Sequence, residues 1–276
     1  MMKKIIIITD NTCDLTQDII EKEQLVVLQI KAYVGEKSVT DLTDKELFSL
    51  VDSTHTLPKT AALNAVEFEK VFEKYSKEGD VVYIGLGSGF SSTFSTAYLT
   101  SQDFDNVYVV DSQNLSTGIG LLVLKACKYR AEGLTAEEIK AKVEELVPQV
   151  RTQFAIDTLK YLHMGGRCSG MASFAGTMLN LKPIIKVINN KLEVAKKPIG
   201  FKKALKAMLE DVVSKAENID LDYISITHCL APEDAVYLKE ELAKVFDEKV
   251  LDENRASIVI SSHCGPITIG ILYIEK

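Results

Sequence analysis

A glycine- and hydroxyl-rich segment, residues 85–97, is the part of the chain whose residue types most clearly indicate chemistry. It follows the β-branched run 81–84 and precedes a stretch that is compatible with a helix. Its glycines alternate with other residues and its hydroxyls then cluster: Gly85, Gly87, Gly89, Ser91, Ser92, Thr93, Ser95 and Thr96. Free N–H groups and the positive end of a helix dipole at a strand–loop–helix junction favour an anion. A tight structural turn explains the same residues equally well.

The segment matches none of the well-known phosphate-binding or nucleophile-bearing loops. Phe90 and Ser92 stand where a dinucleotide fingerprint needs its third glycine, and no lysine follows the glycines as in a Walker loop. Ser88 and Ser91 each lack one glycine of the G-x-S-x-G elbow. Asp111 follows the next predicted strand, where a ribose-binding acid could stand. A nucleotide-dependent enzyme or a serine hydrolase that uses residues 85–93 therefore remains an alternative interpretation.

Small polar residues also follow two other predicted strands. The first strand leads into residues 10–14 and the strand at 106–110 leads into residues 111–116, and both segments contain Asp, Asn and hydroxyl side chains. Because the carboxyl ends of parallel strands line the ligand crevice of such a sheet, this convergence predicts one polar crevice. Asx turns and helix caps are an equally good explanation of each turn alone.

Two motifs in the second half add candidate residues. Arg167 follows Gly165 and Gly166, and arginine forms bidentate hydrogen bonds to carboxylates and phosphates. His263 opens the sequence His-Cys-Gly-Pro after a strand predicted at 256–262, where it can face a crevice or satisfy local backbone groups. A plain surface arginine is the simpler interpretation of Arg167 taken alone. No H-x-x-x-H or C-x-x-C spacing occurs, so no metal site is expected.

The elements that would position these residues alternate between strand and helix in the first half, which predicts a doubly wound, mostly parallel sheet. The second half mixes strands, helices and a hairpin at Asn189-Asn190, which predicts an α+β domain with a mixed sheet. We therefore expect an α/β protein with two domains, residues 1–150 and 151–276. Predicted strands are 4–9, 25–34, 80–84, 106–110, 151–156, 222–229, 256–262 and 267–275. Predicted helices are 16–23, 44–52, 65–78, 92–102, 115–132, 136–149, 159–166, 201–217 and 232–246.

Composition disfavours several classes of protein. The net charge of the 276 residues is −7, and no basic patch is evident from the sequence, so no nucleic-acid partner is expected. No apolar run approaches about 18 residues, so we expect no stable membrane insertion. The apolar stretch after Lys4 is too short for an export signal, and the five cysteines are scattered. We expect a cytoplasmic protein with reduced thiols.

Taken together, these segments resemble the DegV family of bacterial lipid-binding proteins from end to end. The D-S-x-x-D-L pattern of that family corresponds to residues 10–15, and its S-x-x-L-S-G-T-Y loop to residues 87–94, with Ser92 in place of the glycine. L-x-Y-L-x-x-G-G-R is matched in full by residues 159–167, K-P-I is present at 182–184, and H-x-G-P is matched at 263–266. The T-S-Q-P segment keeps only Thr60, and Ile267 replaces the glycine that follows H-x-G-P in the family.

The resemblance implies a protein that binds one long-chain fatty acid and has no catalytic residues, metal or cofactor of its own. Thr60, Ser91, Ser92, His263 and Gly265 would hold the carboxylate at the interface of the two domains. A separate dihydroxyacetone-kinase-like fatty acid kinase would phosphorylate that carboxylate for phospholipid synthesis, and Arg167 would face the kinase or its phosphoryl group.

The resemblance also implies an apolar tunnel for the acyl chain in the second domain. Met171, Phe174, Met178 and Ile184 are candidate lining residues, since methionine and mixed apolar side chains suit a flexible hydrocarbon. Burial of an acyl chain of about 16 carbons would contribute roughly 12 kcal/mol before the costs of binding. Without the resemblance, an ordinary hydrophobic core is the better interpretation of these residues.

Overall fold

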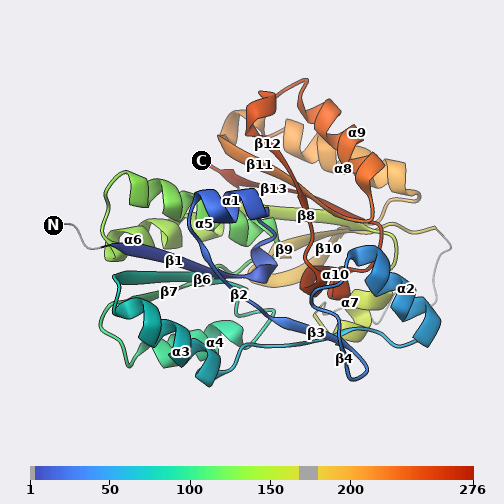
Figure 1. Ribbon diagram of the computed structural model, residues 1–276. Helices are drawn as coiled ribbons and strands as arrows, with labels where there is room; N and C mark the ends of the chain where they lie inside the picture. The colour runs from blue at the N-terminus through green and yellow to red at the C-terminus, as the bar shows by residue number, and fades with distance from the viewer. Residues whose placement is uncertain (1–3, 168–179) are drawn as a thin grey trace. The chain divides into compact units, whose positions relative to one another are not determined.

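The computed structural model describes residues 4–167 and 180–276 (Figure 1). Its strands are β1 Ile5–Asp10, β2 Val26–Leu28, β3 Lys31–Val34, β4 Lys37–Ser38, β5 Lys59–Ala61, β6 Asp80–Gly85, β7 Val107–Asp111, β8 Val150–Ile156, β9 Ile184–Ile188, β10 Lys191–Lys196, β11 Ile219–Cys229, β12 Leu251–Arg255 and β13 Thr268–Glu275. Its α-helices are α1 Gln17–Lys22, α2 Asp44–Thr54, α3 Ala65–Ser76, α4 Thr93–Ser101, α5 Thr117–Ala131, α6 Ala136–Leu146, α7 Lys160–Gly165, α8 Phe201–Val213, α9 Pro232–Leu242 and α10 Ile258–Cys264.

The chain divides into two compact units, and each unit takes two stretches of sequence. The first unit comprises Met1–Ile30 and Ala61–Gln149, and the second comprises Lys31–Thr60 and Val150–Lys276. This division differs from the expected domains 1–150 and 151–276 in one segment, because residues 31–60 group with the C-terminal half. The reason is packing: Val34, Leu47 and Phe48 share a hydrophobic cluster with Tyr161 and Ile258.

The first unit is built on a parallel four-stranded sheet in the order β2-β1-β6-β7. Helices α3 and α4 lie on one face of this sheet, and α5 and α6 lie on the other (Figure 1). The central strands are buried on both faces, as in β6, where Val81 to Ile84 have no exposed surface. This unit is therefore the doubly wound α/β layer that the apolar strands predict.

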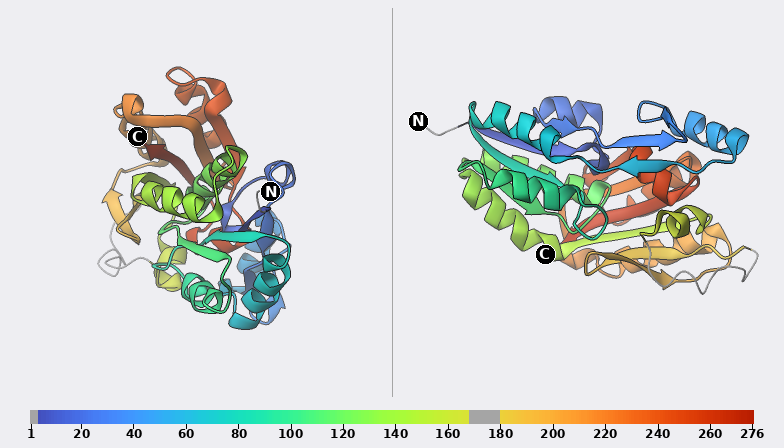
Figure 2. Two further views of the ribbon diagram at one scale, coloured as in Figure 1. Left: turned by 90° about the vertical axis from the view of Figure 1, so that its left-hand side faces the viewer. Right: turned by 90° about the horizontal axis from the view of Figure 1, so that it is seen from below.

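The second unit contains a mixed six-stranded sheet in the order β10-β9-β8-β13-β11-β12 and the small sheet β4-β3-β5. All neighbours in the large sheet are antiparallel except β11 and β12, which are parallel. Helices α8 and α9 cover one face of the large sheet, where Leu205, Met208 and Leu238 pack on Ile226 and Ile271. Figure 2 shows the hairpin of β9 and β10 at the edge of this sheet. The mixed sheet confirms the α+β character expected for the second half.

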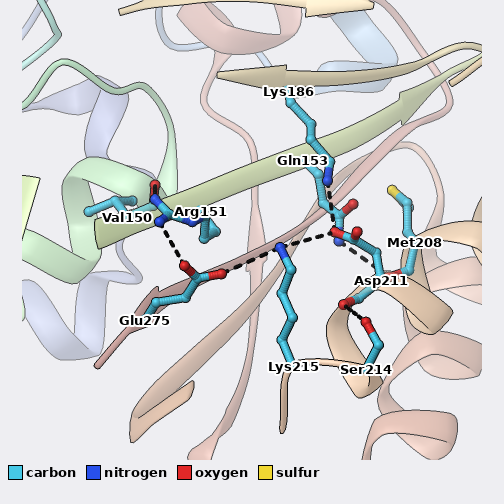
Figure 3. A network of polar contacts seen from close by, with 9 residues as sticks. All are labelled: Val150, Arg151, Gln153, Lys186, Met208, Asp211, Ser214, Lys215 and Glu275. Atoms are coloured by element: carbon cyan, nitrogen blue, oxygen red, sulfur yellow. Dashed lines mark hydrogen bonds and ion pairs between the residues drawn. The ribbon is translucent and has the colours of Figure 1, made fainter. Parts of the chain in front are cut away.

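A chain of ion pairs joins α8 to the large sheet (Figure 3). Lys186 on β9 donates to Asp211 on α8 at 2.8 Å, and Lys215 lies between Asp211 and Glu275 at 3.9 and 3.4 Å. Arg151 on β8 completes the chain with a 2.6 Å contact to Glu275, which lies on β13. Burial opposes the charge of Asp211, but the hydrogen bond from Lys186 and the positive charges of the lysines outweigh it and lower the pKa of Asp211. The network therefore fixes the end of α8 against three strands.

Two predicted elements are wrong in type or extent. Residues 256–262 were expected to form a strand, but 258–264 form the helix α10, whose first turn is capped by the Ser257 hydroxyl accepting from the Ile260 N–H at 3.4 Å. The strand of that region is β12, which precedes the helix. Residues 25–34 were expected to form one strand, but they form β2 and β3 in different sheets, so the chain changes units at Ile30 and Lys31.

Candidate functional site

The second unit contains a cavity of about 280 Å³ at the point where the segment 57–60 meets α7 and α10. Three of the candidate residues from the sequence line it: Thr60, Arg167 and His263. The remaining lining residues are Leu57, Pro58, Lys59, Tyr161, Gly165 and Ser262. The lining combines apolar side chains with hydroxyls, one imidazole and two cationic side chains, which is the composition of a pocket for a small anionic group.

Thr60 and His263 form the polar centre of this cavity. Thr60 lies on β5 and His263 in the last turn of α10, and Oγ1 of Thr60 lies 2.8 Å from Nε2 of His263. When Nε2 carries the imidazole proton it donates to Oγ1, and the Thr60 hydroxyl then has its own proton to donate to a ligand. A carboxylate only accepts hydrogen bonds, so its binding would select this tautomer.

Two glycines hold the cavity wall in close contact with ring side chains. A Cβ on Gly165 would lie 2.7 Å from Nδ1 of His263, so only glycine leaves room for the imidazole at this position of α7. Gly265 has a φ of +85°, and a Cβ there would lie 2.5 Å from the ring of Tyr161. The Tyr161 ring packs edge-on against Phe48, with 5.6 Å between ring centroids. The motifs that contain these glycines therefore shape the cavity around His263 and Tyr161.

Burial and the nearby Arg167 lower the pKa of His263 to about 4. The imidazole is therefore neutral at neutral pH and acts as a hydrogen-bonding group without charge. Positive charge at the cavity comes from Lys59 and Arg167, both of which are exposed. Arg167 also donates from Nη1 to the carbonyl oxygen of Gly165, which ties its guanidinium to the end of α7. The site as a whole therefore attracts an anion with two cations and can orient it with neutral donors.

The glycine loop lies in the first unit, and its backbone donors are used within the protein. Asp10 accepts hydrogen bonds from the Leu86 N–H and the Tyr83 hydroxyl, both at 2.9 Å. Asp111 accepts from the N–H of Ser88 at 3.0 Å and from its hydroxyl at 2.6 Å. Two carboxylates beside the loop would repel a phosphate. This arrangement favours the structural explanation of the glycines over a nucleotide site.

Close packing gives two of these glycines a purely structural reason. A Cβ on Gly85 would lie 2.1 Å from the Tyr83 hydroxyl oxygen, and one on Gly87 would lie 2.6 Å from the Asn114 nitrogen. The loop is therefore glycine-rich because the backbone passes close to its neighbours.

Ser91 and Ser92 follow this loop at the start of α4. The Ser91 hydroxyl oxygen accepts from the Thr93 N–H at 3.2 Å and lies 2.9 Å from the Thr93 hydroxyl. When the Thr93 hydroxyl is the donor in that pair, Ser91 has its proton to offer elsewhere. Ser92 is exposed, and its carbonyl oxygen accepts from the N–H of Thr96 at 3.0 Å.

The sequence-predicted residues therefore fall into distinct groups. The second unit brings Thr60, Arg167 and His263 to one cavity, whereas Ser91 and Ser92 lie in the first unit. Ile184 is 1% exposed and belongs to the core between the large sheet and α8 and α9, outside the lining of this cavity. The candidate tunnel residues Met171, Phe174 and Met178 lie outside the described residues.

Sequence reasoning missed two prominent residues of the cavity, Tyr161 and Lys59. Tyr161 is the tyrosine of the matched segment 159–167, so the motif itself was a signal for this residue. Lys59 carried none, because an exposed lysine beside a proline is common in any surface loop. Within residues 4–167 and 180–276, no three His, Cys, Asp or Glu side chains gather as a metal site would require. In the same part of the chain, no helix is long and apolar enough to cross a membrane.

Comparison with known proteins identifies the class of this fold and site. Residues 4–276 match the family model described as an uncharacterised protein of the DegV family. A DegV domain-containing protein from Clostridium acetobutylicum is 33% identical over 282 residues, which cover the full length of both chains. The chain therefore belongs to the DegV family.

Solved structures of this family superpose on the whole chain. A DegV-family protein from Thermus thermophilus, described as binding fatty acid, has a TM-score of 0.89 and 29% identity, and the match covers 99% of this chain and 100% of that one. DegV of Bacillus subtilis, described as a fatty-acid-binding protein, has a TM-score of 0.86 and 27% identity, with coverage of 99% and 100%. These likenesses confirm the family that the motifs indicate.

Proposed function

We propose that this protein binds one long-chain fatty acid and holds its carboxylate in the cavity around Thr60 and His263. The observation that carries the proposal is the 2.8 Å Thr60–His263 pair in a cavity that Lys59 and Arg167 also line. The description of two relatives as fatty-acid-binding proteins supports the choice of a fatty acid over other anions.

The carboxylate is expected to accept a hydrogen bond from the Thr60 hydroxyl, because an imidazole protonated at Nε2 donates to Oγ1 and leaves the threonine proton for the ligand. Gly265 takes part by allowing the turn after α10 to pass the Tyr161 ring. We extend the carboxylate site to Ser91 and Ser92 because both residues lie in the loop that matches the family motif. The Ser91 hydroxyl can also donate a hydrogen bond when the Thr93 hydroxyl donates to it. We assign the acyl chain to the segment that contains Met171, Phe174 and Met178. The core packing of Ile184 makes it a weaker candidate for that tunnel.

We further propose that the bound fatty acid is the substrate of a separate dihydroxyacetone-kinase-like kinase. In that step the γ-phosphoryl group passes from ATP to a carboxylate oxygen and yields an acyl phosphate and ADP. Arg167 supports this role because it lines the cavity and is exposed, so its guanidinium can contact a phosphoryl group from outside. The chain would act as the substrate-presenting subunit.

Organic extraction of gently purified protein, followed by mass spectrometry, tests the central claim. We expect about one fatty acid per chain, and tight binding of added palmitate or oleate after delipidation. The Ser91→Ala variant should retain less lipid than the Ser95→Ala variant, which removes an exposed hydroxyl four residues after Ser91, within α4. A protein that contains no lipid and binds neither acid would exclude the proposed function.

A further inference from the structure

The chain has a strongly basic segment, although its net charge is negative. Residues 182–206 contain eight lysines, one acidic residue (Glu193) and no arginine, which gives this segment a charge of +7. The rest of the chain has 24 basic and 38 acidic residues, a charge of −14. The expectation that the chain has no basic patch was therefore wrong, because it depended on the overall balance. We define the lysine surface as the six exposed lysines of this segment: Lys191, Lys196, Lys197, Lys202, Lys203 and Lys206.

The fold places these lysines on neighbouring elements of the second unit. Lys191 and Lys196 lie on β10, which is the edge strand of the large sheet, and the turn after β10 leads directly into α8. Figure 2 shows this hairpin beside α8. Lys202, Lys203 and Lys206 occupy the first two turns of α8 and are exposed, because that helix packs through Leu205 and Met208.

Four of the six exposed lysines form no ion pair in the described part of the chain, unlike the two lysines beneath them. Lys182 pairs with Asp157 and Lys186 with Asp211, so these inner charges are neutralised. Within the described part of the chain, Lys191, Lys196, Lys202 and Lys203 have no ion pair within 4 Å. A concentration of charge of one sign on neighbouring elements is costly to folding and is typical of a surface that meets a charged partner.

Two exposed isoleucines flank the lysines. Ile188 precedes the hairpin turn with 38% exposure, and Ile199 follows β10 with 53% exposure. The strand and its flanks therefore present apolar side chains at both ends of a lysine row about 25 Å long. Lysine stems can lie along apolar material while their ammonium groups remain in water. Exposed apolar side chains combined with lysines are typical of protein surfaces that bind at the interface of a lipid bilayer.

We propose that the lysine surface docks this protein on an anionic lipid bilayer, with Ile188 and Ile199 entering the headgroup region. Four to eight clustered lysines match the number that anionic lipid surfaces attract, and each contributes about a fivefold factor in binding. The absence of arginine from the segment fits a mobile layer of headgroups better than a fixed protein carboxylate, for which a bidentate partner is preferred. The choice of a lipid surface rests on the proposed function, since a poorly soluble fatty acid reaches a soluble protein most readily at a bilayer.

Vesicle co-sedimentation of the full chain tests this proposal. The probes are vesicles of phosphatidylcholine alone and vesicles with about 30% phosphatidylglycerol, at low salt and at about 0.5 M salt. The test variant is Lys191→Glu, Lys196→Glu and Lys203→Glu together. The control variant is Lys45→Glu, Lys70→Glu and Lys249→Glu, which changes the net charge equally at exposed lysines outside the surface.

We expect the wild type and the control variant to sediment with the anionic vesicles at low salt and to remain in solution with the neutral ones. The test variant should bind the anionic vesicles at least a hundredfold more weakly, and high salt should release every variant. If the wild type does not bind the anionic vesicles, the proposal is overturned. A surface that binds an acidic protein instead of lipid would give this result. Equal loss in both variants overturns it as well, because net charge alone would then explain binding. Fatty-acid content measured on the same preparations tests the proposed function separately.

Discussion

Replacement of Gly165 by alanine would place a methyl group against the imidazole of His263. The added Cβ would lie 2.7 Å from Nδ1 and 3.5 Å from Cε1 of that ring. Ordinary contact between such atoms begins at about 3.4 Å, so the ring has to move by about 0.7 Å. A movement of that size equals the margin between the 2.8 Å Thr60–His263 distance and the limit of about 3.5 Å for a useful hydrogen bond.

Gly165→Ala should affect both the fatty-acid affinity and the stability of the protein. Loss of the oriented Thr60 donor should weaken fatty-acid binding about tenfold, which corresponds to about 1.4 kcal/mol for one hydrogen bond to a charged group. The free energy of unfolding should fall by about 1–2 kcal/mol, because the added methyl group crowds the His263 ring and this cost exceeds the better helix propensity of alanine at the last residue of α7. Titration with a fluorescent fatty acid gives the affinity, and thermal unfolding gives the stability.

The neighbouring glycine is a matched control. Gly166 has a φ of +67°, and a Cβ there would meet no atom within 4 Å. Gly166→Ala should therefore lower the free energy of unfolding by about 1 kcal/mol through backbone strain, with no effect on binding. Fatty-acid affinity within twofold of the wild type in Gly165→Ala would refute the assignment of Thr60 and His263 to the carboxylate site.

Two other perturbations test the framework of the second unit. Ile267 is a β-branched residue with a φ of +54°, so Ile267→Gly should raise the free energy of unfolding by about 1 kcal/mol, and unchanged thermal unfolding would contradict this. Asp211→Asn should destabilise the protein by about 1–2 kcal/mol at neutral pH, because Lys186 and Lys215 lose their shared partner. The folded-state pKa of Asp211 is lowered from 3.8, so this contribution is present above about pH 4 and is lost as the pH falls further. Urea unfolding from pH 7 to pH 3 should therefore show the wild type and Asp211→Asn converging in acid, and a constant difference between them would contradict the role of the carboxylate.

Local signals in the sequence were enough to predict much of the fold. The pairs Asn64 with Glu67 and Thr135 with Glu138 predict helix starts, and both form capping boxes in the structure. The helix α10 was harder to predict, since the β-branched run 258–260 favours a strand and only the Ser257 cap marks the start of a helix. The strand β12 has the reverse problem. Its sequence Leu-Asp-Glu-Asn-Arg has no strand signal, and it is a strand because it pairs with β11.

The candidate site was less predictable, because its residues are remote in sequence. Thr60 and His263 are separated by 203 positions, and no spacing rule connects a threonine and a histidine so far apart. The resemblance to a family was the only sequence signal that put them together. Lys59 needed the structure, since its position at the cavity depends on how β5 packs.

Residues 31–60 belong to the second unit but are synthesised long before most of it. Val34, Leu47 and Phe48 leave the ribosome early, but their partner Ile258 lies about 200 residues later in the chain. At about 5–20 residues per second, this apolar segment waits roughly 10–40 s before Ile258, the last of its partners, has been made. The nascent chain therefore exposes these apolar side chains, without all of their packing partners, for most of its translation. A fragment that begins at residue 150 would lack the threonine of its own site, however well its sheet folded.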